Sequence, residues 1–310
     1  MGTYLVPALV EAGHEVTVLA RGKREPYQGG PAWRRVTREV CDRAAEEKAG
    51  TFAARVRGQR PDAVIDLICY KLESAQALVQ AVRGAVRHFL HCGTIWIYGA
   101  TEVAPTPEDF PRRPFGEYGV QKAAIEAFLL DEARRGGFPA TCVHPGHIVG
   151  PGWAPINPAG HLDPAVFERL AAGDEVVLPD QGLATLHHVH ASDVAQVFMH
   201  ALANWSVAAG ESFHAVSPAA LTLRGYASAV AGWYGREAKL SFRPWEQWKA
   251  AVPARDAEIT WDHISRCPCA SMEKARRLLG FTPRYTSLEA IREALVWLIA
   301  NGRVKAPPLQ

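Results

Sequence analysis

The chain has 310 residues, of which 48% are hydrophobic and 21% are charged, a composition typical of folded globular proteins rather than disordered chains. Its 34 basic and 32 acidic residues give a net charge of +2, so bulk charge indicates neither nucleic acid nor an anionic membrane as a partner. The sequence has no run of about eighteen apolar residues and no basic stretch at its start, which argues against transmembrane and secretory interpretations. The six cysteines are scattered, which favours reduced thiols in a cytoplasmic protein.

Strand-like and helix-like segments alternate through the first half of the chain. The predicted strands are 15–19, 63–68, a segment from 86 that runs into a loop at 91–99, and a segment from 140, whereas the predicted helices are 3–12, 74–82 and the stretch from 118 onward. This alternation predicts an α/β fold with a doubly wound parallel sheet. From residue 151 the sequence becomes rich in Pro, Gly and Trp, and the length of the chain exceeds a usual single core, so we expect a second, smaller lobe.

The segment 102–114 is too rich in proline for a helix. It lies between a predicted strand and a predicted helix, so it is placed either as a wall of an active site or as a stiff surface connection. The sequence alone leaves both interpretations open.

Two clusters resemble metal ligands at first sight. Cys267 and Cys269 flank a proline, and His187, His188 and His190 are close together. No second cysteine pair has the spacing of a zinc site, and the histidines have no nearby set of carboxylates. We therefore predict no metal site.

Tyr118 and Lys122 are separated by three residues, which places a phenol and an ammonium on the same face of a helix. A lysine charge near a tyrosine favours the phenolate, and it would bring the phenol from its reference pKa of about 10 towards neutral pH. The pair is therefore a candidate for proton transfer. Spacing alone is also met by an exposed tyrosine and a solvated lysine.

A buried strand followed by Thr94, a Tyr-Gly pair at 98–99 and then the Tyr-x-x-x-Lys helix resembles the short-chain dehydrogenase/reductase superfamily. More specifically, the chain resembles the extended branch, the NAD-dependent epimerase/dehydratase family. Residues 143–152 are similar to the family's Arg-Pro-Gly-x-x-Tyr-Gly-Pro-Gly loop, residues 188–195 to its His-Val-x-Asp-Val-Ala segment, and residues 271–283 to its closing Lys-Ala-x-x-x-Leu-Gly-Phe-x-Pro. The motifs occur in the family's order and cover nearly the whole chain.

The start of the chain departs from this pattern. The family opens with a strand and a Gly-x-x-Gly-x-x-Gly loop that holds the cofactor pyrophosphate, whereas Gly2 matches only the last glycine of that loop. The missing strand is central in the usual strand order, so we expect a gap between the strands at 15–19 and 63–68. A misplaced start codon or a truncation is the interpretation favoured here. We expect an upstream extension of about ten residues to restore stability and cofactor binding.

The resemblance implies a bound nicotinamide dinucleotide. An acidic residue normally accepts hydrogen bonds from the NAD ribose at the end of the second family strand, but Ala20 occupies this place and Arg21 follows it, with Lys23 and Arg24 nearby. These cations would attract a 2′-phosphate, so NADP is favoured and NAD is the second choice. The alternative is that the basic loop is only a solvated turn. The remaining residues expected at the cofactor are Gly2, Asp42, Arg43, Leu67, Lys122, Pro145 and Ile148.

For the reaction, the resemblance implies hydride transfer at a carbinol or carbonyl carbon. Tyr118 would transfer the proton, Lys122 would lower the tyrosine pKa and hold the nicotinamide ribose, and Thr94 would donate a hydrogen bond to the developing oxyanion. The residues expected to face the substrate are His144, His147 and Trp153. Leu186 replaces the arginine that binds the substrate diphosphate in the family, which weakens the case for a sugar nucleotide.

The expected organisation follows from these matches. Residues 1–150 and 186–215 would form the dinucleotide-binding domain, and 151–185 and 216–310 the substrate-binding lobe. The substrate is expected to be a small molecule, and family members that dimerise do so through the Tyr-x-x-x-Lys helix. Three functional alternatives stay open: a simple NADPH-dependent ketone or aldehyde reductase, a non-catalytic nucleotide-binding or RNA-associated protein, and an inactive truncated relative.

Overall fold

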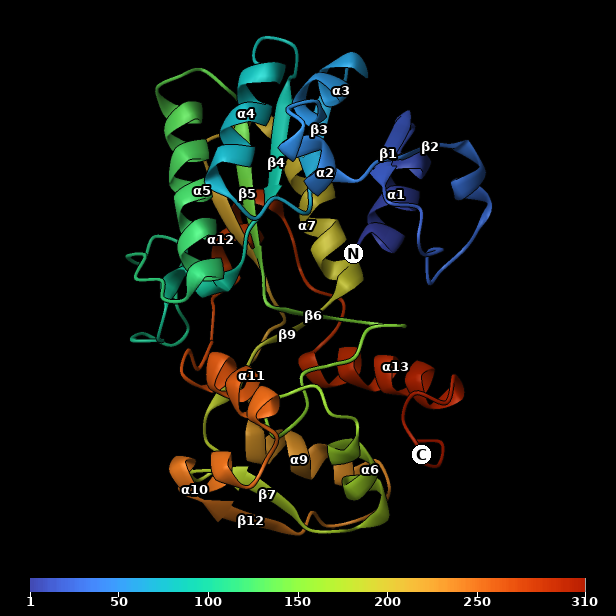
Figure 1. Cartoon of the computed structure of the whole chain (residues 1–310), viewed down its shortest axis with the longest axis vertical. Helices are drawn as coiled ribbons and strands as arrows, with labels where there is room; N and C mark the ends of the chain where they lie inside the picture. Colours follow the sequence, from blue (N-terminus) through green and yellow to red (C-terminus); the bar gives the residue numbers. More distant parts are fainter. Residues whose placement is uncertain (310) are drawn as a thin grey trace.

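The computed structural model describes residues 1–309. In the view of Figure 1, an upper lobe of helices around a parallel sheet stands above a smaller lower lobe, and two short strands cross between them. The confirmed fold is α/β with a parallel sheet.

The main sheet has four parallel strands in the order β10-β5-β4-β3, which are Ser212–Ala215, Ala140–Pro145, His88–Cys92 and Ala63–Asp66. Side chains alternate between its two faces, and both faces are buried. Phe89 packs with helices α4 (Leu72–Val82) and α5 (Glu117–Arg134), whereas Leu90 packs with α7 (Ala191–Ala203). These helices cover opposite faces, so the doubly wound arrangement is confirmed.

The sheet is interrupted beside β3. Strands β1 (Val16–Ala20) and β2 (Val36–Val40) form a separate parallel pair, and in residues 1–309 neither β1 nor β3 has a strand partner on its other edge. Figure 1 shows this pair and helix α1 (Gly2–Glu11) set apart from the main sheet. The predicted gap between the two strands is thus present. Helix α1 packs against α7 and shares a hydrophobic core with the main sheet.

The lower lobe has its own hydrophobic core. Its elements are α6 (Ala165–Ala172), β7 (Val176–Pro179) paired with β12 (Leu240–Arg243), β8 (Thr185–Leu186) paired with β11 (Leu221–Thr222), α9 (Leu223–Gly232), α10 (Trp245–Ala250), α11 (Ala254–Ile264) and α13 (Ser287–Ala300). Strands β6 (His147–Val149) and β9 (His188–His190) pair at the junction of the lobes. The remaining short helices are η1 (Pro31–Arg35), α2 (Arg43–Lys48), α3 (Phe52–Gly58), η2 (Ile95–Tyr98) and α8 (Trp205–Ala208).

The position of α12 (Glu273–Leu279) differs from the predicted division of the chain into two lobes. The sequence assigned this segment to the lower lobe, but Ala275, Leu279 and Phe281 are buried in the core of the upper lobe beside β10 and α7. The sequence of a short amphipathic helix does not specify which hydrophobic surface its apolar face will cover. Here the apolar face of α12 covers β10, the outermost strand of the main sheet. Within residues 1–309, none of the helices is long and apolar enough to cross a membrane.

Candidate active site

Helix α5 carries the predicted proton-transfer pair at its N-terminal end. Tyr118 and Lys122 lie one turn apart, as their spacing requires. Tyr118 is 40% exposed, whereas Lys122 is 1% exposed. The phenol therefore remains accessible while the lysine is held inside the protein.

Lys122 ties two loop ends together. Its Nζ donates hydrogen bonds to the main-chain oxygens of Cys69 and Cys92, at 2.7 and 2.6 Å. The ammonium lies 5.9 Å from the ring centroid of Tyr118 and 5.1 Å from that of Tyr70. Burial lowers the pKa of Lys122. A lysine ammonium has three donors, and the two described bonds leave one for a ligand.

The pKa of Tyr118 moves in the direction opposite to the prediction. Burial raises it above the ordinary value, Cys92 and Tyr70 act in the same direction, and only a side-chain hydrogen bond with Thr94 lowers it. The expected lowering by Lys122 is thus not found, because that ammonium is directed at main-chain carbonyls. In this arrangement Tyr118 is a neutral phenol at pH 7, which can donate a proton.

Thr94 follows strand β4 and is 7% exposed. Its Oγ1 caps η2 by accepting a hydrogen bond from the main-chain N–H of Trp96 at 3.3 Å. The same side chain lies close enough to the phenol of Tyr118 to lower its pKa. The structure thus brings Thr94, Tyr118 and Lys122 together, although they come from two separate stretches of chain.

His144 occupies a different place from the one predicted for it. It is fully buried, its Nδ1 accepts a hydrogen bond from the N–H of Thr94 at 3.0 Å, and its Nε2 lies 2.9 Å from Glu126 Oε1. Both ring nitrogens are engaged within the protein, so this geometry does not agree with direct substrate contact.

Sequence reasoning missed two residues behind His144. Glu126 is 2% exposed, and Arg112 binds its carboxylate through Nε and Nη2 at 2.8 and 2.6 Å. Burial opposes ionisation of Glu126, but His144 and Arg112 outweigh it and hold its pKa well below the ordinary value. The available signal was a charge four residues after Lys122 within an otherwise apolar helical stretch. Arg112 also shows that the proline-rich segment reaches the site.

His147 lies near the candidate site but has no direct contact with Tyr118 among the described interactions. Its ring packs edge-on against Trp96, His188 and His263, with centroid distances of 6.5, 5.6 and 5.0 Å. Trp96 in turn lies 5.8 Å from Tyr118. Both ring nitrogens of His147 are buried without a described partner. Substrate contact by His147 stays a prediction, as does contact by Trp153, which is 49% exposed.

The expected cofactor residues are distributed along the strand ends. Ala20 is the last residue of β1, and Arg21, Lys23 and Arg24 follow it in an exposed loop. Gly2 is the first residue of α1, whose first turn holds no acidic side chain. An anionic group would meet no carboxylate from that turn.

The acidic and basic residues after β2 are engaged within the protein. Asp42 caps α2 by accepting a hydrogen bond from the N–H of Ala45 at 3.2 Å. Arg43 binds both oxygens of Asp66, at 2.5 and 3.1 Å, and Nε of Arg43 binds Glu47. Adenine contact by Asp42 and Arg43 would compete with these bonds, so their predicted role has little support from the geometry.

The other expected cofactor residues line the carboxyl ends of the main sheet. Leu67 follows β3, Pro145 ends β5, and Ile148 lies in β6; Leu67 and Ile148 keep part of their surface exposed. The ammonium of Lys122 lies at the same edge, since it is bonded to the main-chain oxygen of Cys92, the last residue of β4. In open α/β sheets, ligands bind outside the carboxyl ends of the strands. The residues present at this edge therefore fit a nicotinamide dinucleotide.

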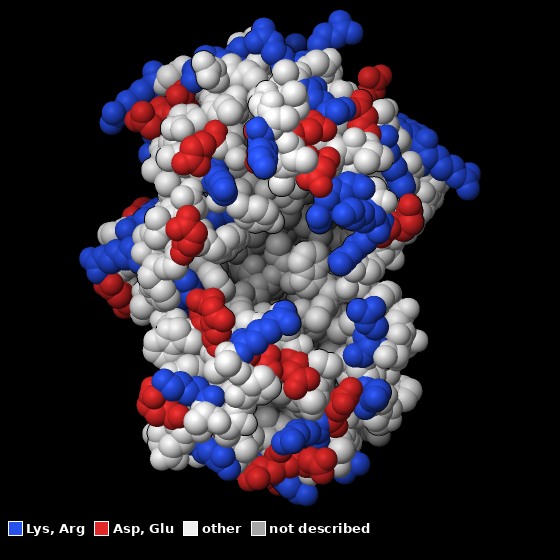
Figure 2. Space-filling view, viewed as in Figure 1, with Lys and Arg blue, Asp and Glu red and all other residues white. Residues whose placement is uncertain are grey.

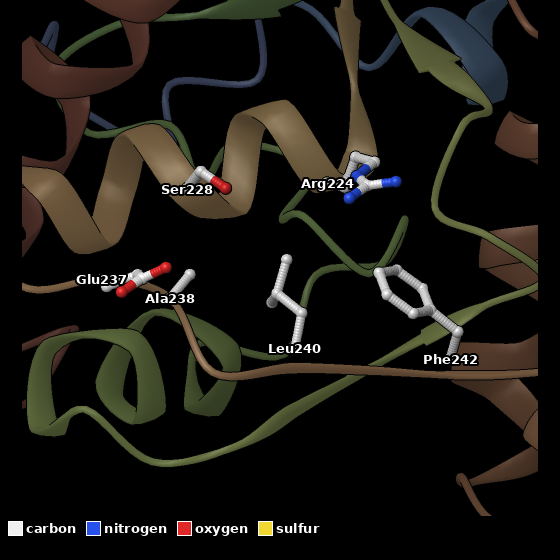
Figure 3. A pocket seen from close by; sticks show the side chains of 6 residues that line it. All are labelled: Arg224, Ser228, Glu237, Ala238, Leu240 and Phe242. Carbon is white, nitrogen blue, oxygen red and sulfur yellow. The ribbon is translucent and has the colours of Figure 1, made fainter.

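A hollow opens between the two lobes. Figure 2 shows it near the middle of the molecule, with Lys and Arg side chains gathered along one side of its rim. A second depression, of about 420 Å³, lies in the lower lobe between α9 and β12. Figure 3 shows Arg224 and Ser228 from the helix facing Phe242 and Leu240 from the strand. None of the predicted catalytic residues borders it, so we do not assign the reaction to it.

The clustered histidines have partners inside the protein. His187 Nε2 lies 2.9 Å from the main-chain oxygen of Ser217, His188 Nε2 3.1 Å from that of Ile156, and His190 Nδ1 2.5 Å from the hydroxyl of Ser192. Throughout residues 1–309, no group of three or more His, Cys, Asp or Glu side chains is arranged to hold a metal ion.

Comparison with curated proteins gives relatives over nearly the full chain. The 2'-dehydrokanamycin reductase of Streptomyces kanamyceticus is 28% identical over 309 residues, which is 98% of this chain and 83% of that protein. UDP-glucose 4-epimerase of Corynebacterium glutamicum is 25% identical, covering 94% of this chain and 91% of the relative. The chloroplast stem-loop binding protein of 41 kDa b of Arabidopsis thaliana is 24% identical, with 95% and 75% covered.

Solved structures show the same fold. The UDP-glucose 4-epimerase of Thermotoga maritima, solved with UDP-glucose, superimposes with a TM-score of 0.70 at 20% identity, over 97% of this chain and 96% of that one. The enzyme WbmG of Bordetella bronchiseptica, solved with NAD and UDP, has a TM-score of 0.69 at 19% identity, over 99% and 93%.

A family profile extends these likenesses to membership. The profile described as "NAD dependent epimerase/dehydratase family" matches residues 1–215, which is more than half of the chain. The match includes strand β4, which leads to Thr94, helix α5, which carries Tyr118 and Lys122, and the neighbouring strand β5. The protein is therefore an enzyme of the NAD-dependent epimerase/dehydratase family, with the NAD(P)-dependent oxidoreductase or epimerase chemistry of that family.

Proposed function

We propose that this enzyme oxidises and reduces a carbinol or carbonyl carbon of a sugar-nucleotide-like or other hydroxylated small molecule, in the manner of an epimerase or dehydratase. The observation that carries the proposal is the convergence of the Tyr118 phenol, the Thr94 hydroxyl and the buried Lys122 ammonium at the end of β4. Relatives with epimerase and reductase names support the same chemistry.

Each of the three side chains has a defined task in this proposal. A bound nicotinamide dinucleotide supplies the hydride acceptor and donor. Tyr118, held as a neutral phenol, gives its proton to the substrate oxygen as the carbonyl is reduced and takes it back in the reverse direction. Thr94 donates a hydrogen bond to that oxygen as negative charge develops on it. Lys122 fixes the two strand-end loops and offers its third donor to the nicotinamide ribose.

Retention of the cofactor distinguishes an epimerase or dehydratase from a reductase. An enzyme that oxidises its substrate and then reduces the product regenerates its cofactor, so the cofactor can stay bound through purification. We expect the purified protein to carry nicotinamide and to interconvert UDP-glucose and UDP-galactose or a related pair. Absorbance near the reduced-nicotinamide band after addition of substrate measures whether a bound cofactor is present and becomes reduced, and analysis of the sugar products measures the interconversion. A fully exchangeable cofactor, consumed in proportion to product, would instead assign the protein as a reductase.

A simple NADPH-dependent reductase is the second candidate because of Leu186. This residue is fully buried where the family resemblance expects a diphosphate-binding arginine. The neutral Tyr118 phenol also suits protonation of a carbonyl oxygen during reduction.

The proposed cofactor is NADP, although the family and the WbmG structure are described with NAD. We expect NADPH to bind at least about tenfold tighter than NADH, which corresponds to about 1.4 kcal/mol. The basis is the exposed Arg21 after Ala20, which could pair with a 2′-phosphate. Calorimetric titration of both cofactors measures the ratio. Arg21→Ala should weaken NADPH selectively, whereas Arg135→Ala, at the far end of α5, should not. Equal affinities in the unmodified protein would identify the basic loop as a solvated turn.

The proposal includes a homodimer formed through α5. On this helix Val120 is 45% exposed, although it is an apolar side chain. Light scattering of the purified protein, compared with Val120→Glu, measures whether this surface is used.

A further inference from the structure

Helix α5 carries three polar side chains on successive turns that act on the segment at the end of strand β4, two of them directly and one through another residue. Tyr118, Lys122 and Glu126 are spaced four residues apart, so they share one face of the helix. The side chain of Thr94 lies close enough to Tyr118 to lower the pKa of the phenol, and Lys122 donates to the main-chain oxygen of Cys92. Glu126 is the third of these side chains, and it reaches the same segment only through another residue.

That residue is His144, at the end of the neighbouring strand β5. Its Nδ1 accepts the N–H of Thr94 at 3.0 Å, which leaves the proton of the neutral ring on Nε2. The Nε2–H can then donate to Glu126 Oε1 at 2.9 Å. Arg112 holds both oxygens of this carboxylate in a bidentate pair and balances its charge. The chain of bonds runs from Arg112 through Glu126 and His144 to the main chain of Thr94.

The imidazole of His144 packs directly against Gly93, at the point where it bonds to the N–H of Thr94. A Cβ atom at Gly93 would overlap with Nδ1 and Cε1 of His144, so only glycine lets the imidazole approach the N–H of Thr94. His144 is fully buried and Glu126 is 2% exposed. Hydrogen bonds without competing water define a geometry more strictly than exposed ones do.

We propose that His144 and Glu126 are positioning residues, which fix the main chain of Thr94 so that its hydroxyl stays beside the phenol of Tyr118. The inference rests on the catalytic roles proposed for Thr94 and Tyr118. Neither His144 nor Glu126 touches the reacting atoms. Loss of their contact moves Thr94 away from the substrate oxygen, and small displacements of reacting groups can lower rates by about a hundredfold.

The test compares two equally buried histidines. His144→Leu removes the acceptor for Thr94, whereas His144→Asn can return an oxygen to the position of Nδ1. The matched control is His88→Leu: His88 is 2% exposed, lies on the same strand that leads to Thr94, and within residues 1–309 its one side-chain hydrogen bond is to Thr141, at 2.8 Å. Turnover is measured with the UDP-sugar or keto sugar that the unmodified enzyme uses fastest, at a temperature where circular dichroism shows each variant folded. Amide hydrogen exchange is followed in the peptide that contains Thr94.

We expect His144→Leu to lower kcat at least tenfold with KM within about threefold, and to raise exchange at Thr94. His144→Asn should recover much of the loss, and the His88→Leu control should keep kcat within about threefold. A kcat for His144→Leu equal to that of the His88→Leu control would overturn the proposal.

Gly93→Ala provides an independent variant if His144→Leu does not fold. The added methyl group displaces His144, so kcat should fall as in His144→Leu. In a His144→Ser variant there is room for the methyl group, so adding Gly93→Ala should lower kcat little further. Full additivity of the effects of His144→Ser and Gly93→Ala on kcat would contradict the proposal. Tyr118→Phe distinguishes failure of the proposed function from failure of the positioning role. If Tyr118→Phe stays active, the proposed function is wrong. If Tyr118→Phe is inactive but the His144 and Gly93 variants keep their kcat, only the positioning role is wrong.

Discussion

Tyr118→Phe is expected to lower turnover by about 10²- to 10⁴-fold, the usual contribution of a positioned acid or base. The change deletes the transferable proton and leaves the ring and its packing against Trp96 in place. Binding of the cofactor, measured by calorimetry, should be almost unaffected because the phenol is not expected to hold the dinucleotide. Kinetics at saturating substrate then report the proton-transfer step.

Tyr70 provides the matched control for this experiment. The ring centroids of Tyr70 and Tyr118 are 6.3 Å apart, and the Lys122 ammonium is closer to the Tyr70 ring (5.1 Å) than to the Tyr118 ring (5.9 Å). Tyr70 is 55% exposed. We expect Tyr70→Phe to keep most of the turnover. If Tyr70→Phe abolished the reaction while Tyr118→Phe did not, the wrong phenol would have been assigned.

Lys122→Met should affect both binding and rate. The substitution removes the bonds that join the loops at Cys69 and Cys92, and it removes the donor proposed for the nicotinamide ribose. A rate loss with unchanged affinity for the cofactor would contradict the second of these roles.

The fold was predictable because its main signals are local. Period-two and helical patterns placed β3, β4, β5 and α5 within a few residues, and the family motifs fixed their order. The position of α12 was not predictable in this way. Its burial in the upper lobe depends on which surface is left uncovered beside β10, a property of the assembled sheet.

The candidate site was predicted only as far as its motif extends. Tyr118, Lys122 and Thr94 follow from spacing and resemblance, whereas the direction of the Tyr118 pKa does not, because it depends on burial and on the carbonyls that engage Lys122. The place of His144 was not predictable from the motif either. The resemblance assigned it to the substrate, whereas packing engages both of its ring nitrogens within the protein. Its neighbours Glu126 and Arg112 are distant in sequence, and only packing of α5 against β5 brings them together.

Acidification is expected to destabilise this protein steeply below about pH 6.5. Five fully enclosed histidines have pKa values lowered by burial, to about 4 or about 3; they are His88, His187, His188, His190 and His214. In the unfolded chain the same imidazoles titrate near 6.5. Between these values the unfolded state binds more protons than the folded state, so the free energy of unfolding falls as the pH falls.

The magnitude follows from the number of sites. Each histidine contributes up to about 1.4 kcal/mol per pH unit in this window, so five together can remove several kcal/mol between pH 7.5 and 5.5. That loss is comparable with the whole stability of a typical domain, about 5–15 kcal/mol. Urea unfolding at a series of pH values measures the slope.

Buried carboxyl groups modify this slope without reversing it. The lowered pKa of Glu126 adds to acid destabilisation, whereas burial raises the pKa values of Glu108 and Asp193, which favours the folded state once they take up protons. This opposing contribution extends upward from about pH 4, where the carboxyls of the unfolded chain titrate, but two carboxyls can take up at most two protons and the five histidines outnumber them. His88→Gln should reduce the slope by the equivalent of one proton. A free energy of unfolding that stayed constant from pH 7.5 to 5 would show that these imidazoles are solvated in solution, and that the packing described around β9 and β10 opens.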